Sequence, residues 1–289
     1  MKTLMESVAE ARARGAAIGH FNVANVEMLN AIVSAAQEAG EPVIIGASEG
    51  ERDAIGITTL VMLIAEMNKT SSVPIYLNAD HTYSVERVKE AIDAGFDSVI
   101  FDGAKLSFDE NLAHTKECVE YARASGRNVI VEAELGFIGA GSQLLDEIPT
   151  GAAITEDMMT SIPDAVKFVT ETGIDMFAPA VGNIHGMLKN AANPRLSVAR
   201  VKEIADATGV PLVLHGGSGT TDEDFVDAIK AGIGIVHVST ELRRAYRQGL
   251  MQGLTENPDE MAPYKYMKGA REAVKATTLA RIKLFAGKL

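Results

Sequence analysis

Three histidines of this chain lie at or just after the ends of short apolar runs that predict β-strands. They are His81 after residues 75–79, His185 after residues 176–180, and His215 after residues 212–214. Imidazole nitrogens bind zinc and similar divalent ions, and three protein ligands with one open position form the usual catalytic zinc site. Segments this far apart in the sequence meet only in a fold that gathers its strand ends. The histidines therefore predict a metal-dependent enzyme.

Carboxylates interleave with these histidines at predicted strand ends. Asp80 directly precedes His81, Asp102 follows residues 98–101, and Glu134 follows residues 129–133. Neighbouring residues of a strand point to opposite faces, but the chain turns where a strand ends. One of Asp80 and His81 can therefore bind metal while the other faces the substrate. A single strand-end histidine is commonly structural, whereas three with interleaved carboxylates favour an active site.

Two glycine-rich runs follow the sixth and seventh predicted strands. They are Gly-Asn-Ile-His-Gly at 182–186 and Gly-Gly-Ser-Gly at 216–219. Consecutive small residues let backbone N–H groups converge on an anion, and phosphate sites in barrels often use the loops after the last strands. Lys189 lies close enough along the chain to assist. Such a run alone is more often a plain turn, but its place beside a candidate metal ligand favours phosphate binding.

The elements that must position these residues alternate regularly along the chain. The predicted strands are 17–21, 43–46, 75–79, 98–101, 129–133, 176–180, 212–214 and 233–238. The predicted helices are 26–39, 58–69, 85–94, 110–125, 161–172, 198–208, 222–231 and 240–253. Strands buried on both faces read as nearly continuous apolar runs. The pattern predicts one α/β domain over residues 1–289, a closed (β/α)₈ TIM barrel with its active site at the carboxyl ends of the strands.

Two further features, and one alternative fold, bear on the architecture. A charged helical extension is expected over about 254–289, where it would brace the barrel or make an oligomer contact. The long segment 136–161 after the fifth strand has the length of a functional lid. A doubly wound open sheet is the alternative fold.

Composition limits the classes of partner. Of the 289 residues 47% are hydrophobic, and the net charge is −12. An acidic surface does not suit a phosphate backbone, so no nucleic-acid partner is expected. The amino terminus lacks the apolar core of a signal peptide, and no apolar run approaches the ~20 residues that span a bilayer. The single cysteine, Cys118, forms no intrachain disulfide, which suits a reducing compartment. We expect a cytoplasmic protein with no membrane partner.

Five ordered motifs resemble those of the class II, metal-dependent aldolases that act on fructose or tagatose 1,6-bisphosphate. They are Asn-Ala-Asp-His (78–81), Phe-Asp-Gly (101–103), Val-Glu-Ala-Glu-Leu-Gly (131–136), Gly-Asn-Ile-His-Gly (182–186) and Leu-Val-Leu-His-Gly-Gly-Ser-Gly (212–219). The likeness runs from His-Phe-Asn-Val at 20–23 to the closing helix at 271–285, nearly the whole chain.

The resemblance implies a role for each matching residue. His81, His185 and His215 would hold the catalytic zinc, with Glu134 and Asp102 forming an alternative or buried metal position. Asp80 would be the acid–base group. The substrate and its phosphate would be bound by Gly182, Lys189, Gly216, Ser218, His237, Ser239 and Thr240. The family also implies a phosphorylated sugar substrate, a monovalent cation (Na⁺ or K⁺) near the phosphate, and a homodimer or higher homo-oligomer.

The chemistry of aldol cleavage agrees with a metal. Negative charge develops on the ketose carbonyl oxygen, and either a divalent ion or a Schiff-base lysine stabilises it. The eight predicted strands contain no lysine, since Lys105 and Lys189 both follow strands. The sequence therefore favours the metal route, with fructose 1,6-bisphosphate as the leading substrate and glycerone phosphate and glyceraldehyde 3-phosphate as products.

Departures from the family pattern leave alternatives open. Asn183 and Ile184 replace the usual Thr-Ala pair, and His237 stands where an asparagine is expected. Ser239 stands where fructose-specific members often carry an acid. The acidic loop that exchanges a proton on the three-carbon ketone is missing, and Glu147 is its candidate replacement. The alternatives are tagatose 1,6-bisphosphate or another phosphorylated ketose, isomerisation or epimerisation of a sugar phosphate, and a barrel without catalytic activity.

Overall fold

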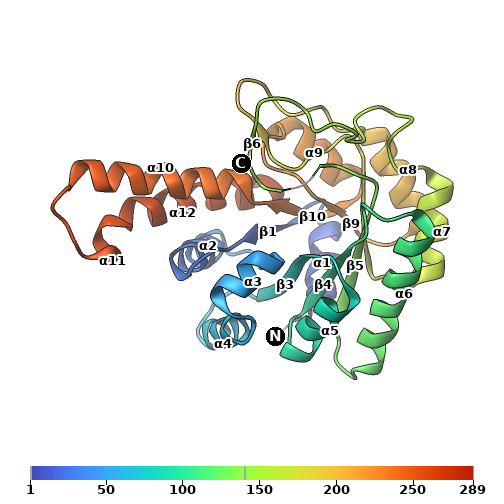
Figure 1. The fold of residues 1–289 in the computed structure, drawn as a ribbon, viewed down its shortest axis with the longest axis horizontal. Helices are drawn as coiled ribbons and strands as arrows, with labels where there is room; N and C mark the ends of the chain where they lie inside the picture. Colours follow the sequence, from blue (N-terminus) through green and yellow to red (C-terminus); the bar gives the residue numbers. More distant parts are fainter. Residues whose placement is uncertain (1, 140, 289) are drawn as a thin grey trace.

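A computed structural model shows a closed barrel of eight parallel strands (Figure 1). It describes residues 2–139 and 141–288, so Met1, Leu289 and Ala140 of the predicted lid lie outside the described residues. The barrel strands are β1 (Ile18–Asn22), β2 (Val43–Ala47), β3 (Ile75–Thr82), β4 (Ser98–Asp102), β5 (Ile130–Leu135), β7 (Met176–Pro179), β9 (Leu212–Leu214) and β10 (Ile233–Val238). Pairing of β10 with β1, which sets His237 opposite His20, closes the ring. The predicted (β/α)₈ TIM barrel is confirmed.

Helices cover the outside of the barrel. They are α2 (Val26–Ala39), α4 (Ile57–Asn68), α5 (Val85–Ala94), α6 (Phe108–Ala124), α7 (Ile162–Thr172), α8 (Val198–Thr208) and α9 (Asp222–Ala231). Local signals set most of their ends. The side chains of Ser84, Ser161 and Thr221 cap helix amino termini, and Gly40 and Gly173 end helices in the left-handed conformation. These caps explain why the predicted helices agree closely with the observed ones.

Two helices were not predicted. α1 (Leu4–Ala13) closes the amino-terminal end of the barrel, where Leu4 and Val8 pack in a buried cluster with residues of the strands. α3 (Glu49–Ile55) precedes α4 and begins at a capping box between Ser48 and Glu51. Charged residues dominate α3, so no apolar period marks it in the sequence.

A helical arm projects from one side of the barrel (Figure 1). It consists of α10 (Thr240–Glu256), α11 (Pro263–Tyr266) and α12 (Lys268–Phe285). The carboxyl end of α12 returns to the barrel, where Ile282 and Phe285 are buried and the Phe285 carbonyl accepts a hydrogen bond from the Ala17 N–H at 3.0 Å. The arm includes the outer part of α10, so it begins before the predicted extension at about residue 254. Through these contacts α12 braces the barrel.

Two loops at the carboxyl end of the barrel are joined. The segment after β5 contains β6 (Leu144–Leu145), which pairs in parallel with β8 (Met187–Leu188) from the segment after β7. An ion pair of 2.8 Å between Lys189 and Asp146 extends this contact. The predicted lid is thus attached to the loop that carries His185. Among the described helices, none is both long and apolar enough to cross a membrane.

Candidate active site

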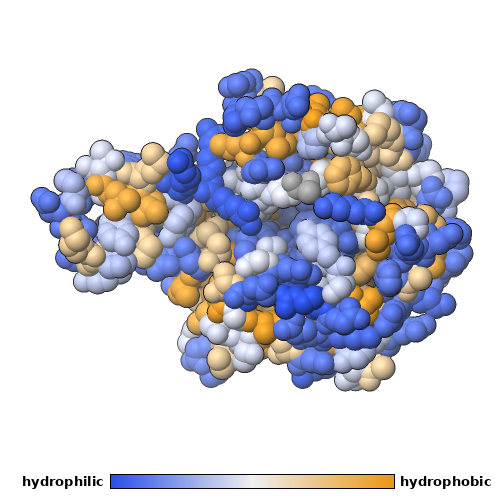
Figure 2. All heavy atoms as spheres, in the orientation of Figure 1, coloured by the Kyte–Doolittle hydropathy of each residue, from blue (hydrophilic) through white to orange (hydrophobic). Residues whose placement is uncertain are grey.

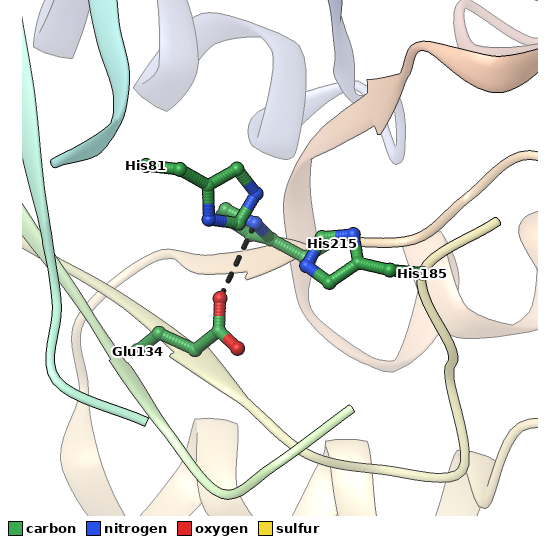
Figure 3. A group of neighbouring side chains, drawn as sticks. All are labelled: His81, Glu134, His185 and His215. Carbon is green, nitrogen blue, oxygen red and sulfur yellow. Dashed lines mark ion pairs between the residues drawn. The ribbon is translucent and has the colours of Figure 1, made fainter. Parts of the chain in front are cut away.

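The three strand-end histidines meet Glu134 in one cluster (Figure 3). His81 comes from β3, Glu134 from β5, His185 from the loop after β7, and His215 from the residue after β9. One ligand atom from each of the four lies within 4.8 Å of the others. The shared carboxyl-end placement of parallel strands thus brings together residues that are up to 134 positions apart.

The cluster has donor atoms without partners. His185 Nε2, His215 Nδ1 and Glu134 Oε2 are buried and have no hydrogen-bond partner in the described part of the chain. The nearest approach is 3.5 Å between His215 Nδ1 and Glu134 Oε2, which is long for a hydrogen bond. Unpaired buried polar atoms are costly, so several that converge need a common partner. Two or three nitrogens with a carboxylate oxygen form a donor set that fits a divalent metal.

Two carboxylates outside the cluster orient its histidines. Asp102 Oδ2 accepts a hydrogen bond from His81 Nδ1 at 2.8 Å, and Glu132 Oε1 accepts one from His215 Nε2 at 2.8 Å. A carboxylate accepts only, so each contacted nitrogen carries the proton and the other nitrogen faces the cluster. This carboxylate–histidine arrangement is the usual support of metal-binding imidazoles. The structure thus places Asp102 behind His81, whereas Glu134 is the carboxylate within the cluster.

Electrostatics in the cluster favour a cation. Burial disfavours charge on His81, yet the carboxylates of Asp80 and Asp102 raise its pKa to about 10. Burial, with Asp102 nearby, raises the pKa of Glu134 to about 8. Both shifts favour protonation: that of His81 because carboxylates surround it, and that of Glu134 mainly because it is buried. A bound divalent ion would supply positive charge in place of protons.

Asp80 is held beside the cluster with one oxygen free. Its Oδ2 accepts a hydrogen bond from Asn22 Nδ2 at 2.8 Å, whereas Oδ1 lies 3.5 Å from His237 Nδ1 and has no hydrogen-bond partner among residues 2–139 and 141–288. Burial would raise the pKa of Asp80, but the charge of His81 and contact with His237 hold it well below its usual range. An ionised carboxylate with a free oxygen can take a proton from a hydroxyl group.

A small polar pocket adjoins the cluster on the side of α10. Its lining includes several residues that the sequence assigned to phosphate or substrate binding, namely Gly216, Ser218, His237, Ser239 and Thr240. Thr240 begins α10, so the partial positive charge of a 17-residue helix points at the pocket. The Ser239 hydroxyl is buried without a partner in the described chain. These groups can bind an anion.

Two other predicted binding residues lie elsewhere. Lys189 directly follows β8 and pairs with Asp146. It lines neither this pocket nor the second cavity that adjoins the cluster, which contains Lys105 and Arg243. Gly182 has a φ of +99° and packs against the backbone of Arg195, so it shapes the chain before His185. Glu147, the candidate proton exchanger, is exposed and outside both pockets.

Several residues of the site were not assigned from the sequence. Asn22, at the end of β1, donates to both Asp80 and Glu51, and Glu51 in turn accepts from Arg243 Nη2 at 2.6 Å. Asn22 meets the strand-end criterion that found the histidines and could have been found by it. Arg243 and Glu51 lie on helices and give no such signal.

The pocket beside α10 depends on glycine at position 216. Gly216 has a φ of +64°, and a Cβ there would collide with the Ile184 carbonyl. We expect Gly216→Ala to raise the KM for an anionic substrate about 10-fold or more, because the loop after β9 must move away from the position of the anion. Steady-state kinetics checks this. Gly15→Ala is the control, because Gly15 has a similar φ of +68° with no atom within 4 Å. An unchanged KM in Gly216→Ala would contradict the assignment.

The fold and the cluster together define the class of protein. A parallel barrel that presents converging histidines and carboxylates at the carboxyl ends of its strands has the design of a barrel enzyme. The buried donor set is one that could hold a metal.

Comparisons with known proteins agree with this class and narrow it. The family model described as fructose-bisphosphate aldolase class-II matches residues 2–288. A fructose-bisphosphate aldolase of Staphylococcus aureus is 38% identical over 286 residues, which cover 98% of this chain and 96% of that protein. The crystal structure of the YdjI aldolase from Escherichia coli K12 has a TM-score of 0.82 and 34% identity, and covers 99% of this chain and 97% of its own. The structure of a putative fructose-1,6-biphosphate aldolase from Coccidioides immitis has a TM-score of 0.81 and 29% identity, and covers 98% of this chain and 95% of its own.

The chain belongs to the class II fructose-bisphosphate aldolase family. It is therefore an aldolase, a lyase that cleaves carbon–carbon bonds, from a family that is generally metal-dependent and acts on phosphorylated sugars.

Proposed function

We propose that this protein catalyses the zinc-dependent, reversible aldol cleavage of a ketose 1,6-bisphosphate. Fructose 1,6-bisphosphate fits best, with glycerone phosphate and glyceraldehyde 3-phosphate as products. The observation that carries the proposal is the convergence of unpaired donor atoms of His185, His215 and Glu134 beside the free oxygen of Asp80. The zinc would be held by His81, His185 and His215, with Glu134 as the neighbouring carboxylate.

The metal and Asp80 divide the chemistry. A bound divalent ion is a Lewis acid, which stabilises negative charge on the ketose carbonyl oxygen. Asp80 takes the proton from the hydroxyl group whose carbon becomes the aldehyde, through the oxygen that Asn22 leaves free. In the synthetic direction Asp80 returns that proton.

Two regions with groups that can bind anions support a substrate with a phosphate at each end. The first phosphate would lie in the pocket formed by Gly216, Ser218 and the start of α10. The adjoining cavity of about 240 Å³ continues from the cluster to Lys105 and Arg243. Amine and guanidinium groups there could bind the second phosphate. By family resemblance, a Na⁺ or K⁺ ion near the first phosphate is also proposed.

A second candidate is the aldol cleavage of tagatose 1,6-bisphosphate or another phosphorylated ketose. It is favoured by His237, which lines the pocket beside Asp80 where the family pattern has an asparagine. Its ring stacks between His20, at a centroid distance of 3.5 Å, and His215, at 4.1 Å. A larger and fixed side chain there changes the room for the substrate hydroxyls, which distinguish these sugars.

The setting of the enzyme is also a proposal. We propose a cytoplasmic homodimer, in line with the family. Support for a second copy comes from the arm, where Met251, Leu254 and Met261 expose 51%, 46% and 78% of their surfaces. Figure 2 shows hydrophobic side chains on this arm. Exposed apolar surface of this kind is typical of protein contacts.

A cleavage assay with a panel of ketose phosphates tests the proposed function. We expect fructose 1,6-bisphosphate to be cleaved with zinc present, and fructose 1-phosphate to show a kcat/KM about 10- to 100-fold lower because it lacks the second charged contact. Tagatose 1,6-bisphosphate in the same assay distinguishes the two candidates. Aldehyde formation is the readout, since an isomerase or epimerase would produce none. No aldehyde from any ketose would refute the proposal.

A pair of lysine variants tests the second phosphate position. Lys105→Met should reduce the preference for the bisphosphate over the 1-phosphate, because Lys105 lines the cavity. Lys116→Met, on the exposed surface of α6, should leave the preference unchanged. If the wild type, Lys105→Met and Lys116→Met all show the same preference for the bisphosphate, the second phosphate lies elsewhere.

A further inference from the structure

Strand β3 contains an irregularity at the two residues most important to the site. Its pairing with β4 sets Ala79 opposite Val99 and Thr82 opposite Phe101, so β3 has one residue more than β4 over this stretch. Asp80 and His81 form the resulting bulge. Two adjacent residues of a regular strand point to opposite faces, whereas both Asp80 and His81 line the same cavity. The bulge makes this possible.

The bulge has a strained backbone. His81 has a φ of +39°, and it is the only non-glycine residue with a positive φ among the described residues. Side chains beyond Cβ disfavour this region, so it persists only where the surroundings hold it. The structure must therefore contain groups that keep the chain in this conformation.

The guanidinium of Arg52 contacts both sides of the bulge. Nη1 of Arg52 donates to the Asp80 carbonyl at 3.1 Å and to the Ala47 carbonyl, at the end of β2, at 2.7 Å. Nη2 donates to Thr82 Oγ1 at 3.1 Å. One rigid planar group thus connects α3, the end of β2, and the residues that begin and follow the bulge.

The surroundings of Arg52 are unusual for a structural arginine. Its side chain is 1% exposed, its Nε has no hydrogen-bond partner in the described chain, and its three hydrogen bonds go to neutral oxygens. A buried charge that lacks a directly bonded counter-ion is costly, and an apolar side chain often gives equal or better stability. Stability alone therefore does not explain a cation at this position.

The structure assigns Arg52 a positioning role: it holds the β3 bulge in the conformation that presents a metal ligand and an acid–base carboxylate to one cavity. The assignment rests on the proposed function, because it takes His81 as the ligand and Asp80 as the acid–base group. Arg52 does not line the cavity and acts through the Asp80 carbonyl and the Thr82 hydroxyl, which flank His81. Asp80 and His81 also line the phosphate pocket, but the groups assigned to the anion, those of Gly216, Ser218, Ser239 and Thr240, come from other strands and their loops, so we expect them to stay in place without Arg52.

The test is Arg52→Met, compared with Arg52→Lys and with Arg200→Met as the matched control. Arg200 also donates to a backbone carbonyl, that of Thr160, but lines neither cavity. We expect Arg52→Met to weaken zinc binding about 10- to 100-fold, measured by chelator competition on folded protein. Its kcat should fall about 10²-fold with KM changed less than about 3-fold, because the acid–base group is misplaced while the phosphate pocket is intact. Arg52→Lys should be intermediate, and Arg200→Met should match the wild type.

The outcomes separate this inference from the function on which it rests. Folded Arg52→Met with wild-type zinc affinity and kcat would overturn the positioning role and leave the proposed function standing. A wild-type protein that neither binds zinc nor cleaves ketose phosphates would overturn the proposed function itself. If Arg52→Met does not fold, Thr82→Val decides, since it removes one contact of the guanidinium and preserves side-chain shape. Zinc affinity lowered a few-fold in Thr82→Val would support the role, and unchanged affinity would overturn it.

Discussion

Asp80→Asn is expected to retain bound zinc and to lose turnover by about 10²- to 10⁴-fold, the usual contribution of a general base. The amide has the shape of the carboxylate, and its oxygen can still accept the hydrogen bond from Asn22. It cannot take a proton from the substrate hydroxyl. The measurements are kcat and the zinc content of the same preparation.

The control for Asp80→Asn is an aspartate with a similar local role far from the cavity. Asp175 Oδ2 accepts from the Val131 N–H at 2.8 Å near the start of β5, and Asp175 also pairs with Arg123. Asp175→Asn should reduce stability without changing kcat by more than a few-fold. If Asp80→Asn behaves in the same way, Asp80 is not the acid–base group.

Removal of the metal is expected to abolish cleavage, and added zinc should restore it. The donor atoms of His185, His215 and Glu134 have no other partner in the described structure, so the ion completes the site. The metal-free protein should also unfold more easily, because zinc at a thousandfold excess over its Kd adds about 4 kcal/mol to the free energy of unfolding. Activity and thermal unfolding with chelator, and then with zinc, provide two independent readouts.

A pair of histidine variants extends the metal experiment. His185→Ala removes one of the converging donors and should purify with little zinc and no measurable cleavage. His114→Ala removes an exposed histidine of α6 and should match the wild type in both respects. Full activity in the presence of a strong chelator would rule out the metal mechanism.

The order of strands and helices could be predicted because its signals are local. An apolar run such as residues 212–214 is recognisable by itself, and caps such as Ser161 and Gly173 act within a few residues of the helix ends that they stabilise. The exceptions follow the same logic. α3 lacks an apolar period, and the two-residue strands β6 and β8 are too short to carry one.

The candidate site could be predicted only where a residue's place on a strand determines its place in space. His81 and His215 were found because the carboxyl ends of parallel strands lie together in a barrel. Lys189 was assigned to the phosphate because it is near His185 in sequence, yet its side chain pairs with Asp146 away from the pocket. Lys105 and Arg243 reach the cavity from other elements.

The sequence by itself determined the barrel, the end of it that holds the candidate site, and most of the residues that meet there. Only the tertiary structure decided how Asp80 and His81 can face one cavity, because a β-bulge is a property of the register between two strands. The same holds for Arg52 and Asn22, whose partners in β3 lie 28 to 58 positions away in the chain. Periodicity and caps record contacts within an element, whereas register and long-range hydrogen bonds exist only after the elements have packed.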